Sequence, residues 1–340
     1  MQRIRLADVA AAAGVSRSLA SLVYRGAAGV AEATRARVLT AGARLGYSPN
    51  RAASQLAAQR GNSIGVFLQD LRNDLFADVH QGLREVAEQA GRHLVLAVGT
   101  LDGERDTASL LALEETRVDV VVAVGLRLDD TAVQAFAKRV PVVMVARRVE
   151  GLDGAESDNR VGARLAVEQL IALGHREIVF LANPPSDGYL DRRIGYVDAM
   201  RRAGLLARIV ATTYDRSDTA AVAGALLDGA TRPTALFAHN DQAALGVLDA
   251  MASRGLRPGE DIAVVGYDNS SASRLPGAGL TTVDIGGTQL GRLAGQLALR
   301  RIAEPDAAPQ VHTITPRLVV RSTTGVPSRT QRSTSVISNE

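Results

Sequence analysis

Eight short apolar runs between residues 63 and 268 each have the length of a strand, and stretches of helical length separate them. Nearly continuous apolar runs are typical of strands that helices cover on both faces, as in parallel sheets. They form two successive sets: SIGVFLQ, HLVLAVG, VDVVVAVG and VPVVMVA, then REIVFLA, ARIVATTY, TALFAHN and DIAVVGYD. The predicted fold class is α/β, with two doubly wound parallel lobes and a cleft at the carboxyl ends of their strands.

Residues 1–47 have the pattern of short helices instead. Gly14 ends a first helix and Ser16 is suited to cap a second, with the small Ala10 where the two helices must approach closely. This is the helix-turn-helix arrangement, for which an unrelated three-helix module is the alternative. The third helix is expected over 32–45 and ends at Gly46. The positions expected to face inward are Leu6, Val9, Ala13, Leu19, Leu22, Val23, Val38, Leu39 and Leu45.

Charge separates this head from the rest of the chain. Residues 1–60 hold nine arginines against Asp8 and Glu32, a net charge of +7, whereas the whole chain carries +3 and the remainder therefore −4. A compact basic module is typical of nucleic-acid binding, and a solvated basic surface is the simpler interpretation.

Several classes of protein are disfavoured. The chain has no cysteine, and no apolar run reaches the roughly 18–20 residues of a membrane span. The N-terminus lacks the apolar core of a secretory leader, so a cytoplasmic location without membrane contact is expected. The five histidines show no metal-ligand spacing, and no phosphate loop or catalytic constellation is visible. We therefore expect no enzyme, no metal and no cofactor.

Six stretches carry a resemblance: LADVAAAAGVSRSLASLV, GYSPNRAASQLA, SDNRVGARLAVEQLIALGHREIVFLA, HNDQAALGVLDAMASRGLRPGEDIAVVGYDN, LTTV and PRLVVRST. They resemble stretches of the LacI/GalR family of bacterial repressors, and the match covers roughly residues 4–325. The resemblance implies a periplasmic-binding-protein-like pair of lobes and a ligand-controlled, sequence-specific repressor. Its expected partners are double-stranded DNA with a pseudo-palindromic operator, a small-molecule effector and a second copy of the chain. No leucine heptad follows Arg321, so a homodimer rather than a tetramer is expected.

The expected domains alternate between the two lobes. They are a head at 1–47, a hinge at 48–61, a first lobe at 62–157 and 287–314, a second lobe at 158–286 and 315–325, and a disordered tail at 326–340.

The DNA-contacting positions are expected in the head and hinge. They are Arg5, Ser16, Arg17, Ser18, Ser21, Arg25, Thr34, Asn50, Ala53 and Leu56. Arg17 suits bidentate reading of guanine, whereas Arg5 and Arg25 suit phosphate. The resemblance implies that Leu56 wedges between base steps in the minor groove, with a linker leucine as the alternative. The second helix departs from the family's usual Thr-Val-Ser-Arg-Val-Leu-Asn, so no relative's operator can be carried over.

The effector-contacting positions are expected at strand ends. Arg192, Asn240 and Asp268 match the family's ligand contacts, and these side chains suit adjacent hydroxyls, as on a sugar or related polyol. The expected first-lobe partners are Asp70, Arg72, Phe76 and Arg147. Phe76 also fits a core position, and the family commonly has Asp where this chain has Ala146.

Two other classes share parts of this pattern. A solute-binding protein for transport would have the same lobes, but the head and the missing leader argue against it. An α/β enzyme would use the same cleft, and turnover of a bound sugar would distinguish it.

Overall fold

The computed structural model describes residues 4–24, 27, 29–47, 62–184 and 188–327, and the chain divides into two compact units, residues 1–61 and 62–340. The expected hinge at 48–61 and residues 328–340 of the expected tail lie outside the described residues. Within the described ranges no single helix has the length and apolar content to cross a bilayer, and the two short helices 6–12 and 17–24 reach that content only as a pair bent by 105°.

The smaller unit contains three helices, α1 (Leu6–Ala12), α2 (Arg17–Tyr24) and α3 (Glu32–Leu45). Gly14 turns the chain after α1 with a φ of +63°, and the Ser16 hydroxyl accepts the Leu19 N–H at 3.1 Å. These features confirm the helix-turn-helix. Leu22 and Leu39 are 37% and 45% exposed, so the expectation that they face inward is wrong. The buried core of this unit consists instead of small and β-branched residues, among them Ala10, Ala20 and Ala41.

The first lobe of the larger unit is built on a six-stranded sheet in the order β11-β5-β4-β3-β1-β2, and every strand pair in it is parallel. Its strands are β1 (Ser63–Leu68), β2 (His93–Val98), β3 (Val120–Val124), β4 (Val142–Val145), β5 (Asp153–Ser157) and β11 (Val311–Ile314). Its helices are α5 (Asp74–Gln89), α6 (Asp106–Glu115), α7 (Asp130–Ala137) and α12 (Gly287–Ala303).

The second lobe has a six-stranded sheet in the order β12-β10-β9-β8-β6-β7. Its strands are β6 (Ile178–Ala182), β7 (Arg208–Ala211), β8 (Ala235–Ala238), β9 (Ala263–Asp268), β10 (Thr281–Asp284) and β12 (Arg317–Val319). Its helices are α8 (Asn159–Ala172), α9 (Tyr189–Arg202), α10 (Arg216–Asp228) and α11 (Asp241–Ala252). The α/β fold class is confirmed. The edge strand β12 pairs antiparallel with β10, which the expectation of purely parallel sheets missed.

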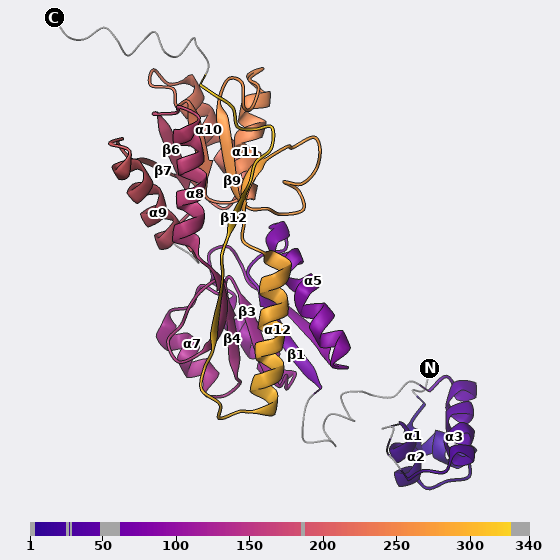
Figure 1. Ribbon diagram of the computed structural model, residues 1–340. Coiled ribbons are helices and arrows are strands. Elements are labelled where there is room, and N and C mark those ends of the chain that lie inside the picture. The colour runs from indigo at the N-terminus through magenta and orange to yellow at the C-terminus, as the bar shows by residue number, and fades with distance from the viewer. Residues whose placement is uncertain (1–3, 25–26, 28, 48–61, 185–187, 328–340) are drawn as a thin grey trace, which may run out of the picture. The chain divides into compact units, whose positions relative to one another are not determined.

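The chain passes between the lobes three times, after β5, after β10 and after β11 (Figure 1). Each passage lies at the carboxyl end of a strand. Loops that follow the strands of both lobes therefore lie around one cleft, where an open α/β sheet binds its ligands.

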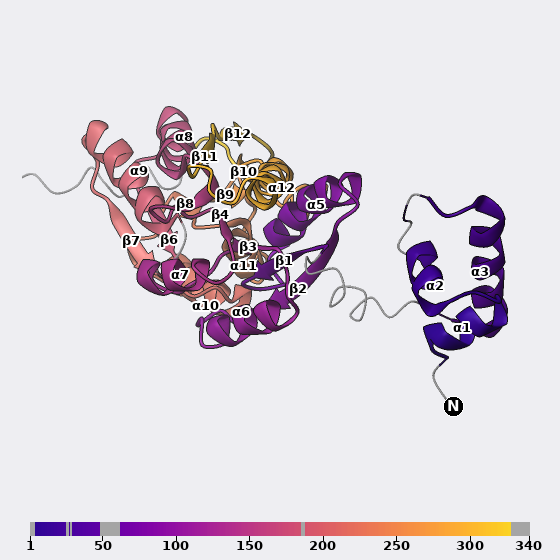
Figure 2. The same cartoon turned by 90° about the horizontal axis from the view of Figure 1, so that it is seen from below.

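Helices α5 and α12 lie side by side against the first sheet (Figures 1 and 2). Their backbones touch through glycine. A Cβ atom added to Gly82 would lie 1.9 Å from the Thr288 carbonyl oxygen, and one added to Gly291 would lie 1.9 Å from that of Val79. Real atoms cannot approach so closely, so both positions need a hydrogen in place of a side chain.

We expect Gly291→Ala to lower the free energy of unfolding by about 1–3 kcal/mol, because the two helices must separate to admit one methyl group. The exposed Gln296 of the same helix provides the control, since Gln296→Ala changes helix propensity without touching α5. Urea unfolding followed by circular dichroism measures both variants. A Gly291→Ala midpoint equal to or above that of the unchanged protein would contradict the close backbone contact.

Candidate functional site in the cleft and on the head

A small cavity of about 50 Å³ lies between the lobes. The first lobe contributes the start of α5 and loops after β1, β3 and β4, and the second contributes α9, the end of β9 and loops after β7 and β8. The lining residues are Gln69, Asn73, Leu75, Phe76, Gly125, Ala146, Arg192, Tyr214, His239, Asn240 and Asp268. The structure thus brings four of the predicted effector residues together: Phe76, Arg192, Asn240 and Asp268. We call this space the deep cavity.

Arg192 is fixed on several sides although it is buried. Its Nε donates to Asn159 Oδ1 at 2.9 Å and its Nη1 donates to the His239 carbonyl at 2.7 Å. The guanidinium also stacks on the Tyr267 ring, 3.9 Å from the ring centre. Its Nη2 lies 3.7 Å from Asp268 Oδ1, too far for a good hydrogen bond.

Asp191 does not pair with Arg192. Although it is the neighbour of Arg192 in sequence, Asp191 lies 3.7 Å from Arg160. Arg192 is therefore directed at the deep cavity.

Unpaired polar atoms line the deep cavity. Asp268 Oδ1, Gln69 Nε2 and His239 Nδ1 are buried without a hydrogen-bond partner among the described residues. Burial raises the pKa of Asp268 well above its usual range, although Arg192 opposes the rise. Burial and Arg192 lower the pKa of His239 well below its usual range. Buried polar groups are nearly always paired in folded proteins, so these atoms can receive the polar groups of a ligand.

Asn240 and Phe76 contribute one polar group and one apolar surface. Asn240 caps α11, since its Oδ1 accepts the Ala243 N–H at 2.9 Å, and its NH₂ group remains for a ligand. Phe76 belongs to the core of the lobe and also lines the deep cavity. The Phe76 ring therefore packs in the core and also faces the space where a ligand ring would lie.

The remaining predicted effector residues lie outside the deep cavity. Arg147 turns away, because its Nη1 donates to the carbonyls of Leu126 and Leu128 at 2.9 and 2.6 Å. Asp70 and Arg72 pair with each other at 3.3 Å and line neither cavity. Arg72 also lies 3.8 Å from Asp215 of the second lobe, so it links the lobes at the edge of the cleft.

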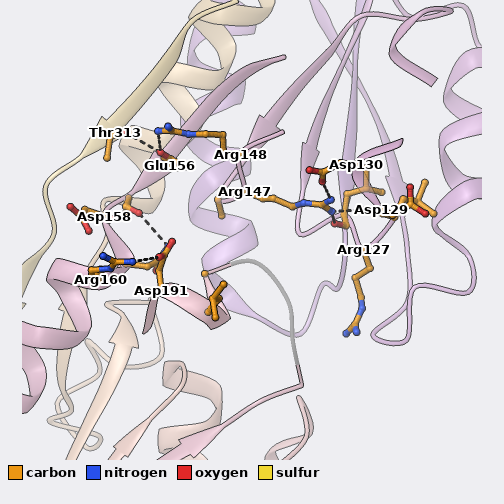
Figure 3. A pocket seen from close by; sticks show the side chains of 17 residues that line it. Arg127, Asp129, Asp130, Arg147, Arg148, Glu156, Asp158, Arg160, Asp191 and Thr313 are labelled. Atoms are coloured by element: carbon orange, nitrogen blue, oxygen red, sulfur yellow. Dashed lines mark hydrogen bonds and ion pairs between the residues drawn. The ribbon is translucent and has the colours of Figure 1, made fainter. Parts of the chain in front are cut away.

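A second cavity of about 940 Å³ adjoins the first, and we call it the wide cavity. Figure 3 shows charged side chains on three sides of it. They form the ion pairs Arg147–Asp130, Arg148–Glu156 and Arg160–Asp191. Its other labelled carboxylates, Asp129 and Asp158, cap α7 and α8. The charges of these walls are therefore largely compensated.

Sequence reasoning missed four polar or aromatic residues of the deep cavity: Gln69, Asn73, Tyr214 and His239. A signal for two of them was present, because Gln69 and His239 directly follow β1 and β8. The same strand-end rule had identified Asp268. Tyr214 is held by its hydroxyl, which donates to the Pro184 carbonyl at 2.9 Å, a contact that no local pattern predicts.

The head presents one face of α2 to solvent. Arg17, Ser18 and Leu22 are exposed and Ser21 is half-buried, whereas Ala20 and Val23 of the opposite face are buried. The spacing 17, 18, 21, 22 is that of one helical face. Of the other predicted DNA contacts, Arg5 and Ser16 are exposed and Thr34 is half-buried. Four more lie outside the described residues: Arg25, Asn50, Ala53 and Leu56.

Family comparisons assign both units. Residues 5–50 match the bacterial regulatory proteins of the lacI family, and residues 167–324 match a periplasmic binding protein-like domain. The repressor PurR of Glaesserella parasuis is 32% identical over 337 residues, covering 93% of this chain and 96% of the relative. The regulator GalS of Salmonella typhimurium is 30% identical over 94% of this chain and 96% of the relative.

Solved structures agree. The Lac repressor dimer bound to operator and the anti-inducer ONPF has a TM-score of 0.83 at 29% identity, covering 95% of this chain and all of that one. The regulator CelR in complex with cellobiose has a TM-score of 0.71 at 29% identity, covering 94% of this chain and all of that one. With its helix-turn-helix head and two-lobed domain, the chain belongs to the LacI family of bacterial DNA-binding transcriptional regulators.

Proposed function

We propose that this chain is a cytoplasmic repressor that binds a pseudo-palindromic operator as a homodimer and is controlled by a sugar or related polyol. In this proposal the effector binds in the deep cavity, and α2 of the head reads the DNA. Neither step requires chemistry on the ligand, a metal or a cofactor.

The observation that carries this proposal is the set of unpaired polar atoms around the deep cavity. A hydroxyl group both donates and accepts, so one hydroxyl can accept from Arg192 Nη2 and donate to Asp268 Oδ1, which lie 3.7 Å apart. Gln69 Nε2 supplies a further donor, and Phe76 supplies an apolar surface for the C–H face of a ring. The structurally similar CelR was solved with cellobiose, which agrees with a sugar ligand.

Control of DNA binding follows from where the walls of the cavity come from. A ligand that contacts both lobes binds one arrangement of the lobes more tightly than another, and so it shifts their equilibrium. The two lobes also contact each other directly. The Asp74 carboxylate accepts from Ser271 Oγ at 2.9 Å and from the Ala272 N–H at 3.0 Å, and Arg274 lies 3.3 Å from Asp78.

The enzyme and transport alternatives are distinguished by simple assays. If the cleft catalysed a reaction, a sugar that binds would be converted over time, and NMR of the mixture would show a product. We expect the sugar to remain unchanged. A transport protein would not retain sequence-specific DNA binding, which the next experiment measures.

Binding to the DNA upstream of its own gene should weaken steeply with salt. The +7 head releases counterions from phosphates, so affinity should fall by about a thousandfold between 50 and 200 mM salt. Arg17→Ala should lose about 1–3 kcal/mol of specific binding, whereas Arg44→Ala, an exposed arginine in the last turn of α3, should lose little. Fluorescence anisotropy measures both, and a flat salt dependence would count against the electrostatic contribution.

Variants of the deep cavity should separate sensing from DNA binding. Arg192→Ala or Asp268→Ala should lower the affinity for a sugar at least tenfold, because the sugar hydroxyl that loses its partner becomes a buried polar group left unpaired, which costs about 1–3 kcal/mol. DNA binding without sugar should persist. Arg201→Ala provides the control, since Arg201 is an exposed arginine of the same helix.

A panel of simple sugars in calorimetric titration, with melting temperatures of the same samples, checks this prediction. Variants that melt earlier but keep their sugar affinity would show that Arg192 and Asp268 are structural residues only.

The assembly should be a dimer joined through the sensing lobes. Light scattering at micromolar concentration should give about twice the 35.7 kDa of one chain. A tetramer would overturn this part of the proposal.

A further inference from the structure

Ala146 lies where the two cavities meet. Among the residues that the structure describes, it is the one that lines both the deep cavity and the wide cavity. The linings also adjoin in sequence, since Gly125 lines the deep cavity and Leu126 the wide one. Asn159 of the wide cavity holds Arg192 of the deep cavity. The two spaces are therefore parts of one cleft, joined beside the methyl group of Ala146.

The volumes of the two spaces are unequal. Pockets that enclose small molecules measure about 300–1,000 Å³. The deep cavity, at about 50 Å³, is far below that range, whereas the wide cavity, at about 940 Å³, lies within it. A ligand anchored by Arg192 and Asp268 has to extend past Ala146 to find the rest of its space.

The backbone keeps the side chain at this junction small. Ala146 has a φ of +66°, a region that costs an ordinary residue about 1–2 kcal/mol. Its N–H donates to the Ala155 carbonyl at 2.9 Å, which holds it there. The next residue, Arg147, is tied back to the carbonyls of Leu126 and Leu128. The side chain at the junction is thus a single methyl group, which leaves space beside it.

The walls of the wide cavity suit an uncharged ligand. Each of its three ion pairs joins an arginine to a carboxylate across the lining. A strongly charged ligand group would be repelled by about as many lining side chains as attract it, because the lining carries four arginines and five carboxylates: Arg127, Arg147, Arg148 and Arg160, and Asp129, Asp130, Glu156, Asp158 and Asp191. Hydroxyl groups can instead accept from the arginines and donate to the carboxylates without separating them.

We propose that the effector is an uncharged molecule of two linked polyhydroxylated rings, such as a disaccharide, that lies across Ala146. One ring end contacts Arg192 and Asp268, the second ring occupies the wide cavity, and the small side chain of Ala146 leaves the passage between them open. This inference rests on the proposed function and specifies the effector class of that same site.

The test compares Ala146→Asn with Ala146→Gly in the full chain. Asparagine and glycine both tolerate a positive φ, so the two variants should fold alike, as melting temperature and binding to the upstream DNA will show. They differ in what fills the junction. The probes are cellobiose, maltose and lactose, with D-glucose and D-galactose as their single-ring counterparts, in calorimetric titration.

We expect at least one disaccharide to bind the unchanged protein at least tenfold more tightly than its monosaccharides. Ala146→Asn should lower the affinity for that disaccharide at least tenfold and change the affinity for monosaccharides less than threefold. The affinity of Ala146→Gly for the disaccharide should stay within threefold of that of the unchanged protein.

Two outcomes would overturn the inference, and they differ in what they say of the proposed function. Monosaccharides that bind as tightly as disaccharides, or an Ala146→Asn variant with full disaccharide affinity, would overturn the two-ring effector across Ala146 and leave a sugar-controlled repressor standing. Binding of no saccharide of either size, with DNA binding intact, would overturn the sugar effector and this inference together.

Discussion

A buried guanidinium group is costly unless partners surround it, and the second lobe is organised around one. Arg192 of α9 draws its partners from three other parts of the lobe: Asn159 at the start of α8, His239 after β8, and Tyr267 and Asp268 at the end of β9. The packing has adapted to this cluster. Gly162 of α8 has no side chain where an added Cβ would lie 2.2 Å from the Tyr267 hydroxyl. Because the cluster also forms the floor of the deep cavity, the stability of the lobe and the shape of the site depend on the same contacts.

Apolar strands were predictable from the sequence and polar ones were not. Six of the apolar runs form strands that are buried along their whole length: β1, β3, β4, β6, β8 and β9. A strand buried on both faces needs apolar residues at nearly every position, so its composition alone predicts it. Strands β5, β10 and β11, with the sequences DGAES, TTVD and VHTI, lie outside those runs. They border the passages between the lobes, where tertiary pairing rather than apolar content decides the conformation.

The candidate site divides in the same way. Asn240 is the second residue after β8 and Asp268 is the last residue of β9, and their positions at these strand ends bring them to the cleft. Arg147 also follows a strand, but a long side chain can turn either way, and its contacts with two carbonyls take it to the wide cavity. Strand position predicts where a backbone goes. The direction of a long side chain depends on partners that are far away in sequence, such as Leu126 and Leu128.

The glycine contact between α5 and α12 restricts how the lobes can move. Helices that slide past each other do so by switching the rotamers of interdigitated side chains, the shear type of motion. Where the backbone of one helix touches the backbone of the other, as at Gly82 and Gly291, no such rotamers exist and sliding requires the helices to part. The first lobe should therefore move as a rigid body. Any rearrangement on effector binding then has to be a rotation, taken up by the torsion angles of the three connecting passages.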